Sequence, residues 1–160
     1  MGHLLLHEEN IVAGLEARNR EDALKKIVDA LPAWRLQGLD KQQILDLIIL
    51  REQIGTTAIG HGIALPHCFS HEVHEPIVAF GVSPGGVPFP SLDGRLVHFI
   101  FILILPLNEA AERQKRQILQ NIKRSLCDRS MQERLKAART ASEIHQLIVP
   151  ESQPAPAFEV

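Results

Sequence analysis

Two segments in the first third of the chain carry apolar residues at the three- and four-residue spacing of an amphipathic helix. The first covers residues 19–31, begins near Asn19 and is ended by Pro32. Its apolar positions are Ala23, Leu24, Ile27, Val28 and Leu31. The second should begin at Asp40, because Asp40 and Gln43 form a capping-box pattern, and should continue to about Arg51. Each predicted helix therefore has one apolar face to bury.

The last third of the chain predicts three more helices. A long helix is expected from Asn108, with a buried side made of Ile118, Leu119, Ile122 and Leu126. A short helix over residues 130–138 follows, and a last helix begins at the capping box of Thr140 and Glu143. Beyond a single domain of residues 1–149, the proline-containing residues 150–160 are expected to form a flexible tail.

Strands are predicted between these two groups of helices. Residues 77–82 and 96–105 are rich in branched and aromatic side chains, and the second segment is apolar enough to be buried on both faces. Turn residues occupy 83–86 and 91–94, while the glycine-rich segment 55–67 predicts a loop with short extended pieces. Helices and strands arranged around one very apolar strand predict an α/β fold, a layered sandwich with a mixed β-sheet.

Composition narrows the class of protein. The chain has 160 residues, 45% of them hydrophobic and 22% charged, which excludes a disordered chain. A formal net charge of −2 gives no whole-chain electrostatic case for binding nucleic acid or a membrane surface. No signal peptide is recognisable, and the longest apolar run is far shorter than the roughly 20 residues that span a bilayer. We therefore expect a cytoplasmic protein without membrane insertion.

Eight histidines, with no tyrosine and one tryptophan, place most of the chemistry available near neutral pH on imidazoles. Among them His67 has the most informative neighbours, since Pro66 stiffens the backbone that presents it. Three kinds of group precede it in the sequence: the guanidinium of Arg51, the hydroxyls of Thr56 and Thr57, and the main-chain amides at Gly55, Gly60 and Gly62. Such groups can hold a phosphoryl group on a histidine nitrogen. The alternative is that the glycines only make turns and His67 is a surface residue.

Residues 51–67, REQIGTTAIGHGIALPH, closely resemble the signature of the enzyme IIA proteins of the phosphotransferase system. The matching branch is the fructose/mannitol type, which includes the nitrogen-regulatory enzymes IIA. The family pattern, roughly R-E-x-x-G-S/T-T-x-I-G-x-G-I-A-x-P-H, is met at almost every position. The resemblance extends over about residues 4–149 and includes the apolar strand that ends in Pro106 and the long helix that follows it.

This resemblance implies a three-layer α/β sandwich with helices on both faces of the sheet. It also implies that His67 accepts a phosphoryl group from the phosphocarrier protein HPr, or from its nitrogen-branch counterpart. The group would pass to a downstream enzyme IIB, transporter or kinase, in regulation or in sugar uptake. Arg51 would be the phosphate-binding arginine, and Thr56, Thr57, Gly60 and Gly62 would line the pocket. The Ser70 hydroxyl is a further candidate, and neither a cofactor nor a metal nor nucleic acid is expected.

One departure from the family concerns a second histidine, which the family usually places early in the long helix. Residues 112–117 read ERQKRQ and contain none. A cationic or amide side chain of this run would replace it electrostatically, because phosphoryl transfer depends mainly on positioning and positive charge. The alternative is a degenerate regulatory binding module that no longer transfers phosphate efficiently.

The other histidines support weaker hypotheses. His61, His67, His71 and His74 lie close in the sequence, so a metal site is conceivable, but no metalloenzyme motif accompanies them. His71 and His74 are expected to be exposed, and His98 to be a satisfied residue of the sheet. Cys68 is expected to line the pocket without pairing with His67, since adjacent strand residues point to opposite faces. Most basic residues of the C-terminal helices are expected on a solvated face.

Overall fold

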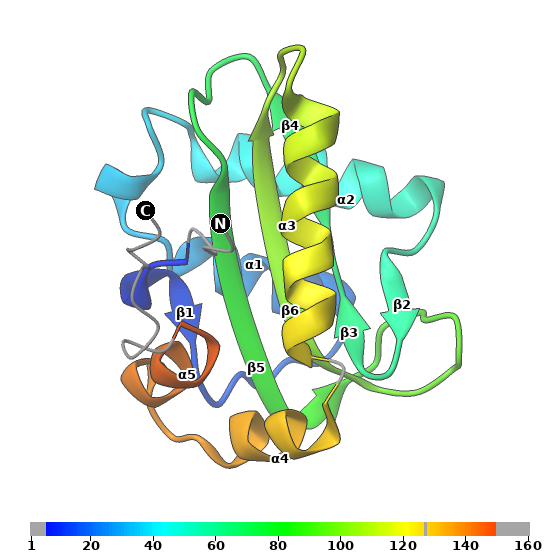
Figure 1. Ribbon diagram of the computed structural model, residues 1–160. Coiled ribbons are helices and arrows are strands. Elements are labelled where there is room, and N and C mark those ends of the chain that lie inside the picture. The colour runs from blue at the N-terminus through cyan, green and yellow to red at the C-terminus, as the bar shows by residue number, and fades with distance from the viewer. Residues whose placement is uncertain (1–5, 127, 150–160) are drawn as a thin grey trace.

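A six-stranded mixed sheet forms the centre of the computed structural model, which describes residues 6–126 and 128–149 (Figure 1). The strands are β1 (Ile11–Val12), β2 (Ala58–Gly60), β3 (Ile63–Ala64), β4 (His67–Ser70), β5 (Ile77–Val87) and β6 (Val97–Pro106). Their order is β1-β5-β6-β3-β2. Strands β3 and β4 lie along the same edge of β6, where β3 pairs with its first half and β4 with its second half. The pairs of β6 with β3 and β4 are parallel, whereas β5 and β6 are antiparallel.

Strand β6 supplies side chains to both cores of the molecule. Its even-numbered residues Ile100, Ile102 and Ile104 belong to one apolar cluster, and its odd-numbered residues Phe99, Phe101, Leu103 and Leu105 belong to another. All seven are at most 1% exposed. This alternation follows from the two-residue period of a strand, and it explains why the segment reads as a continuous apolar run.

Helices cover both faces of the sheet. Helices α1 (Arg20–Asp29) and α2 (Lys41–Ile54) pack on the even-numbered face of β6, and short 3-10 turns cover Glu8–Asn10 and Ala33–Arg35. Helices α3 (Ala111–Leu126), α4 (Arg129–Ala137) and α5 (Ala141–Ile148) pack on the odd-numbered face. Figure 1 shows α3 lying along β6, with its first turn near β4 and its last turn near β3. The predicted three-layer α/β sandwich is confirmed.

Capping side chains start the helices where the sequence predicts. Asn19, Asp40 and Thr140 each accept a hydrogen bond from the backbone N–H three residues later, at 2.8, 3.1 and 3.1 Å. These bonds satisfy N–H groups that have no partner within the helix. At α5 the Glu143 carboxylate accepts from the Arg139 N–H at 2.6 Å, one residue earlier than a capping box requires.

Several boundaries differ from those predicted. The turn expected at residues 83–86 lies inside β5, where the pairing register with β6 shifts between Val82 and Val87. Helix α2 continues to Ile54, and α3 begins at Ala111 rather than at Asn108. The tail expected at residues 150–160 lies outside the described residues. Within the described residues, no helix is long and apolar enough to cross a membrane.

Candidate functional site around His67

His67 is the first residue of β4 and pairs with Leu103 of β6. Because Leu103 faces the core beneath α3, the His67 side chain lies on that same face of the sheet. The segment before it is fixed by two backbone bonds. The Leu65 N–H donates to the Thr57 carbonyl at 3.1 Å, and the Leu103 N–H donates to the Pro66 carbonyl at 2.9 Å. The half-buried imidazole therefore projects from a rigid backbone.

One hydrogen bond determines which imidazole nitrogen is free. Nδ1 of His67 lies 3.0 Å from the Leu65 carbonyl oxygen. A carbonyl can only accept, so Nδ1 carries the proton and Nε2 of the neutral ring carries the lone pair. Burial lowers the pKa of His67, the charges of Arg51 and Lys115 lower it further, and the Leu65 bond and Glu52 oppose them. At neutral pH the ring is consequently neutral, with its lone pair on Nε2.

Two cationic side chains approach this imidazole from different helices. Arg51, in the last turn of α2, donates from Nη1 to the Gly55 carbonyl at 2.9 Å, which caps the end of that helix. Lys115 of α3 places its Nζ 5.8 Å from the centre of the Phe69 ring, whose edge-to-face partner is His67. The Lys115 Nζ also lies 3.2 Å from Glu112 Oε1. Both charges are near enough to lower the pKa of His67, so positive charge acts on the imidazole from the α2 and the α3 side.

A buried carboxylate supports the base of the site. The Glu52 side chain is fully buried and accepts hydrogen bonds from both the backbone N–H and the hydroxyl of Thr57. Arg20 Nη1 lies 3.9 Å from Glu52 Oε1. Because Thr57 in turn holds the Leu65 backbone, the Glu52 carboxylate stabilises the segment that orients His67. The Thr57 hydroxyl thus points to Glu52, and its role is positional.

The remaining predicted phosphate ligands do not gather around His67. The Thr56 hydroxyl donates to the Pro90 carbonyl. Ser70 is an odd number of residues from His67 on β4, so its side chain lies on the opposite face, where Oγ accepts from the Glu72 N–H at 3.1 Å. Gly60 ends β2 and Gly62 lies in the turn before β3, and a Cβ added to Gly60 would meet Asp93, whereas one added to Gly62 would meet His98 and Leu96.

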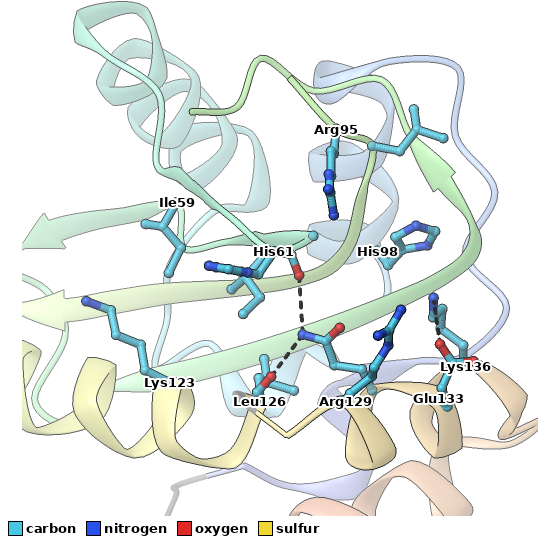
Figure 2. A pocket seen from close by; sticks show the side chains of 13 residues that line it. Ile59, His61, Arg95, His98, Lys123, Leu126, Arg129, Glu133 and Lys136 are labelled. Atoms are coloured by element: carbon cyan, nitrogen blue, oxygen red, sulfur yellow. Dashed lines mark hydrogen bonds and ion pairs between the residues drawn. The ribbon is translucent and has the colours of Figure 1, made fainter. Parts of the chain in front are cut away.

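The β2–β3 turn faces a second pocket (Figure 2). Gly62 lines this pocket together with His61 and His98, whereas His67 and Arg51 do not. Residue Ile63 pairs with Phe99 and His67 with Leu103, so the two places are about 13 Å apart along β6 at the rise of a strand. The contiguous motif 51–67 therefore contributes to two separate sites.

The other candidate side chains have structural surroundings. The expectation that Cys68 lines the pocket around His67 is wrong, because its side chain faces the α1–α2 core. Burial there raises the pKa of the Cys68 thiol to about 12. His71 and His74 are exposed, and His98 bonds the Ser83 carbonyl through Nδ1 at 2.9 Å. Within the described part of the chain, no three histidine, cysteine or acidic side chains group closely enough to hold a metal ion.

Two residues of the site were missed or left unassigned by the sequence analysis, although helical spacing contains a signal for both. Glu52 follows Ile44 and Ile48 at four-residue intervals, and a charged residue on this buried stripe requires partners. Lys115 precedes Ile118 and Ile122 by three and seven residues, so it lies on the buried side of α3. Gln114 lies on the same side of α3, so it is the approach of the Lys115 Nζ to Phe69, and not the spacing, that selects Lys115 within the run 112–117.

Comparison with known proteins gives consistent results. The sequence model of the family described as "Phosphoenolpyruvate-dependent sugar phosphotransferase system, EIIA 2" matches residues 4–150. A nitrogen regulatory protein of Pseudomonas aeruginosa is 32% identical over 88% of this chain and 86% of its own length. A fructose-specific EIIA component of Haloferax volcanii is 30% identical over 81% of this chain and 82% of its own length. The crystal structure of the nitrogen regulatory protein IIA-Ntr from Neisseria meningitidis superposes with a TM-score of 0.80 at 25% identity, covering 92% of this chain and 97% of that one.

Proposed function

Since the chain belongs to the EIIA type 2 family of the phosphoenolpyruvate-dependent sugar phosphotransferase system, we propose that it is a phosphocarrier with His67 as its phosphoryl acceptor. The observation that carries this proposal is the Nδ1 bond to the Leu65 carbonyl, which leaves the Nε2 lone pair free beside two cations. Neutral imidazole is the reactive form, and the lowered pKa of His67 favours it.

The transfer requires no proton movement at the acceptor. The Nε2 lone pair of His67 attacks the phosphorus of a donor phosphohistidine, in line with the donor's nitrogen–phosphorus bond, whose electrons return to the donor ring. Lys115 then replaces the second family histidine as an electrostatic partner of the phosphoryl oxygens. Arg51 donates one N–H to the Gly55 carbonyl. Within the described chain its other N–H groups form no hydrogen bond, so they are available to the phosphoryl oxygens.

The donor is proposed to be HPr or its nitrogen-branch counterpart. Next to Arg51, helix α2 exposes Leu47, Leu50 and Ile54, with exposed fractions of 41%, 58% and 80%. Apolar residues of this kind beside a reactive group are typical of a docking surface. Regulation of the nitrogen type is favoured by the similarity to the P. aeruginosa protein over most of both chains.

The test is phosphorylation of the purified protein by phosphoenolpyruvate, enzyme I and HPr. We expect an acid-labile adduct that disappears in His67→Ala and persists in His71→Ala, an exposed histidine that serves as the matched control. Nitrogen NMR of the adduct should place phosphorus on Nε2. A phosphorylated His67→Ala protein, or phosphorus on Nδ1, would contradict the proposed acceptor geometry.

The second candidate function, a degenerate binding module, is favoured by the lack of histidine in α3. It predicts no adduct on the wild-type protein under conditions in which another EIIA protein is phosphorylated.

Where an adduct forms, mixing the phosphorylated protein with an enzyme IIB domain distinguishes a role in sugar uptake from a role in regulation. Transfer to that domain supports sugar uptake, and retention of the phosphoryl group supports regulation.

A further inference from the structure

The second pocket lies at the opposite end of α3 from Lys115 and has a volume of about 1020 Å³. Its wall carries four cationic side chains and two histidines: Arg95, Lys123, Arg129, Lys136, His61 and His98. Figure 2 shows these side chains arriving from separate elements, with Arg95 from the segment before β6, Lys123 from α3, and Arg129 and Lys136 from α4. A chain of net charge −2 thus concentrates cations in one hollow.

These cations are poorly neutralised by the protein itself. Glu133 is the only carboxylate of the lining, and it pairs with Lys136 at 3.5 Å. Within residues 6–126 and 128–149, the side chains of Arg95, Lys123 and Arg129 form no ion pair within 4 Å, although Arg95 has Asp93 near enough for its charge to lower the pKa of that carboxyl. A concave surface that collects like charges focuses their field and attracts anions. The charge pattern therefore indicates an anionic ligand.

The floor of the pocket is held in place before any ligand arrives. Gln132 Nε2 donates to the His61 carbonyl at 3.2 Å and to the Leu126 carbonyl at 2.9 Å, which joins α4 to the β2–β3 turn and to the end of α3. The His61 N–H donates to Asp93 Oδ2 at 2.9 Å. Nδ1 of His98 is engaged by the Ser83 carbonyl, which leaves Nε2 for a ligand. Such preorganisation lowers the cost of ordering on binding.

Apolar side chains complete the wall. Ile59, Ile63, Leu96 and Leu126 line the pocket between the cations. Pockets for small molecules commonly measure about 300–1,000 Å³, so this one accommodates a ligand with a ring system as well as charged groups. Four cations exceed what one phosphate group needs. We propose that this pocket binds a small organic polyphosphate of the nucleoside diphosphate or triphosphate class, at a site separate from His67.

The probes are ADP, adenosine and inorganic pyrophosphate, titrated calorimetrically into the unphosphorylated full chain. Saturable binding of ADP is expected, with pyrophosphate weaker and adenosine weaker still, because the ligand uses both the cations and the apolar wall. Lys123→Gln should weaken ADP binding about tenfold, the value for one lost hydrogen bond to a charged group. Arg124→Gln is the matched control, an exposed cation of the same helix that does not line the pocket.

The His67→Ala variant separates this site from the phosphocarrier site. Unchanged ADP affinity in that variant supports a distinct pocket, even if phosphorylation of His67 is never observed. Loss of ADP binding in His67→Ala, equal weakening by Lys123→Gln and Arg124→Gln, or no saturable binding of ADP would each overturn the proposal. Binding of polyglutamate but not of ADP would also overturn it, in favour of an acidic protein segment.

Discussion

Removing the Lys115 ammonium tests whether this side chain replaces the second family histidine. The variant is Lys115→Ala, and the measured quantity is the rate of phosphoryl transfer from phospho-HPr to His67 in rapid-quench experiments. Arg116→Ala is the matched control, because Arg116 is the next residue of α3 and is exposed. Lys115→His would restore the residue type of the family and should retain most of the transfer rate.

The expected magnitude follows from charge and distance. The Lys115 Nζ lies beside the Phe69 ring, which is the edge-to-face partner of His67, and a hydrogen bond from an ammonium to a charged phosphoryl oxygen contributes about 1.5–3 kcal/mol. Glu112 at 3.2 Å and partial exposure of the lysine reduce this to roughly 1.4 kcal/mol, a factor of about ten in rate. We expect Lys115→Ala to be slower by about that factor.

A second readout excludes a purely structural explanation. Because the Lys115 charge lowers the pKa of His67, Lys115→Ala should raise that pKa, as followed by proton NMR of the imidazole. Arg116→Ala should leave it in place. An unchanged transfer rate and an unchanged His67 pKa in Lys115→Ala, or an equal rate loss in Arg116→Ala, would refute the reasoning.

Three further predictions concern the groups around the site. Because the pKa of His67 is lowered in the folded protein, the unfolded chain binds more protons as the pH falls below about 6.5. The free energy of unfolding of the wild type, from urea titrations, should therefore fall with decreasing pH more steeply than that of His67→Gln. Parallel pH profiles of the two proteins would contradict this. Burial raises the pKa of Cys68 to about 12, so its thiol should be unreactive in the native protein. With the other cysteine of the sequence, Cys127, replaced by serine, the native protein should resist iodoacetamide at pH 8 while the urea-unfolded protein reacts, and rapid labelling of the folded form would disprove it. Thr57→Val removes a hydroxyl donor from the buried Glu52 carboxylate and should lower the free energy of unfolding by about 2 kcal/mol, whereas a loss near zero would show that Glu52 does not depend on it.

Much of the layered fold is predictable because its signals are local. Asn19, Asp40 and Thr140 start helices through contacts three residues away, and the apolar run of β6 needs only its own sequence to be recognised. Strands β1 and β3 are two residues long and exist through pairing with distant partners. No local pattern specifies such pairs, so their positions could not be derived from periodicity.

The candidate site was predictable in part for a related reason. His67 stood out through Pro66 and the motif, and Arg51 through its place at the end of a helix. A contiguous motif does not have to form one site, however, since the β6 partner of Ile63, the residue after Gly62, lies about 13 Å along the strand from the β6 partner of His67. Lys115 could be recognised among the residues 112–117 only after the helix had been placed against β4.

The pairing of β4 with β6 also determines how the chain tolerates insertions and deletions. His67 opposite Leu103 faces α3, and Cys68 opposite Ile104 faces the α1–α2 core. A slip of one residue between these strands would exchange the two faces, so that the imidazole would enter the apolar core and the thiol would replace it beside Lys115. Substitutions within β4 can be gradual in effect, whereas losing Leu65 or Pro66 would turn the His67 imidazole away from α3 in a single step.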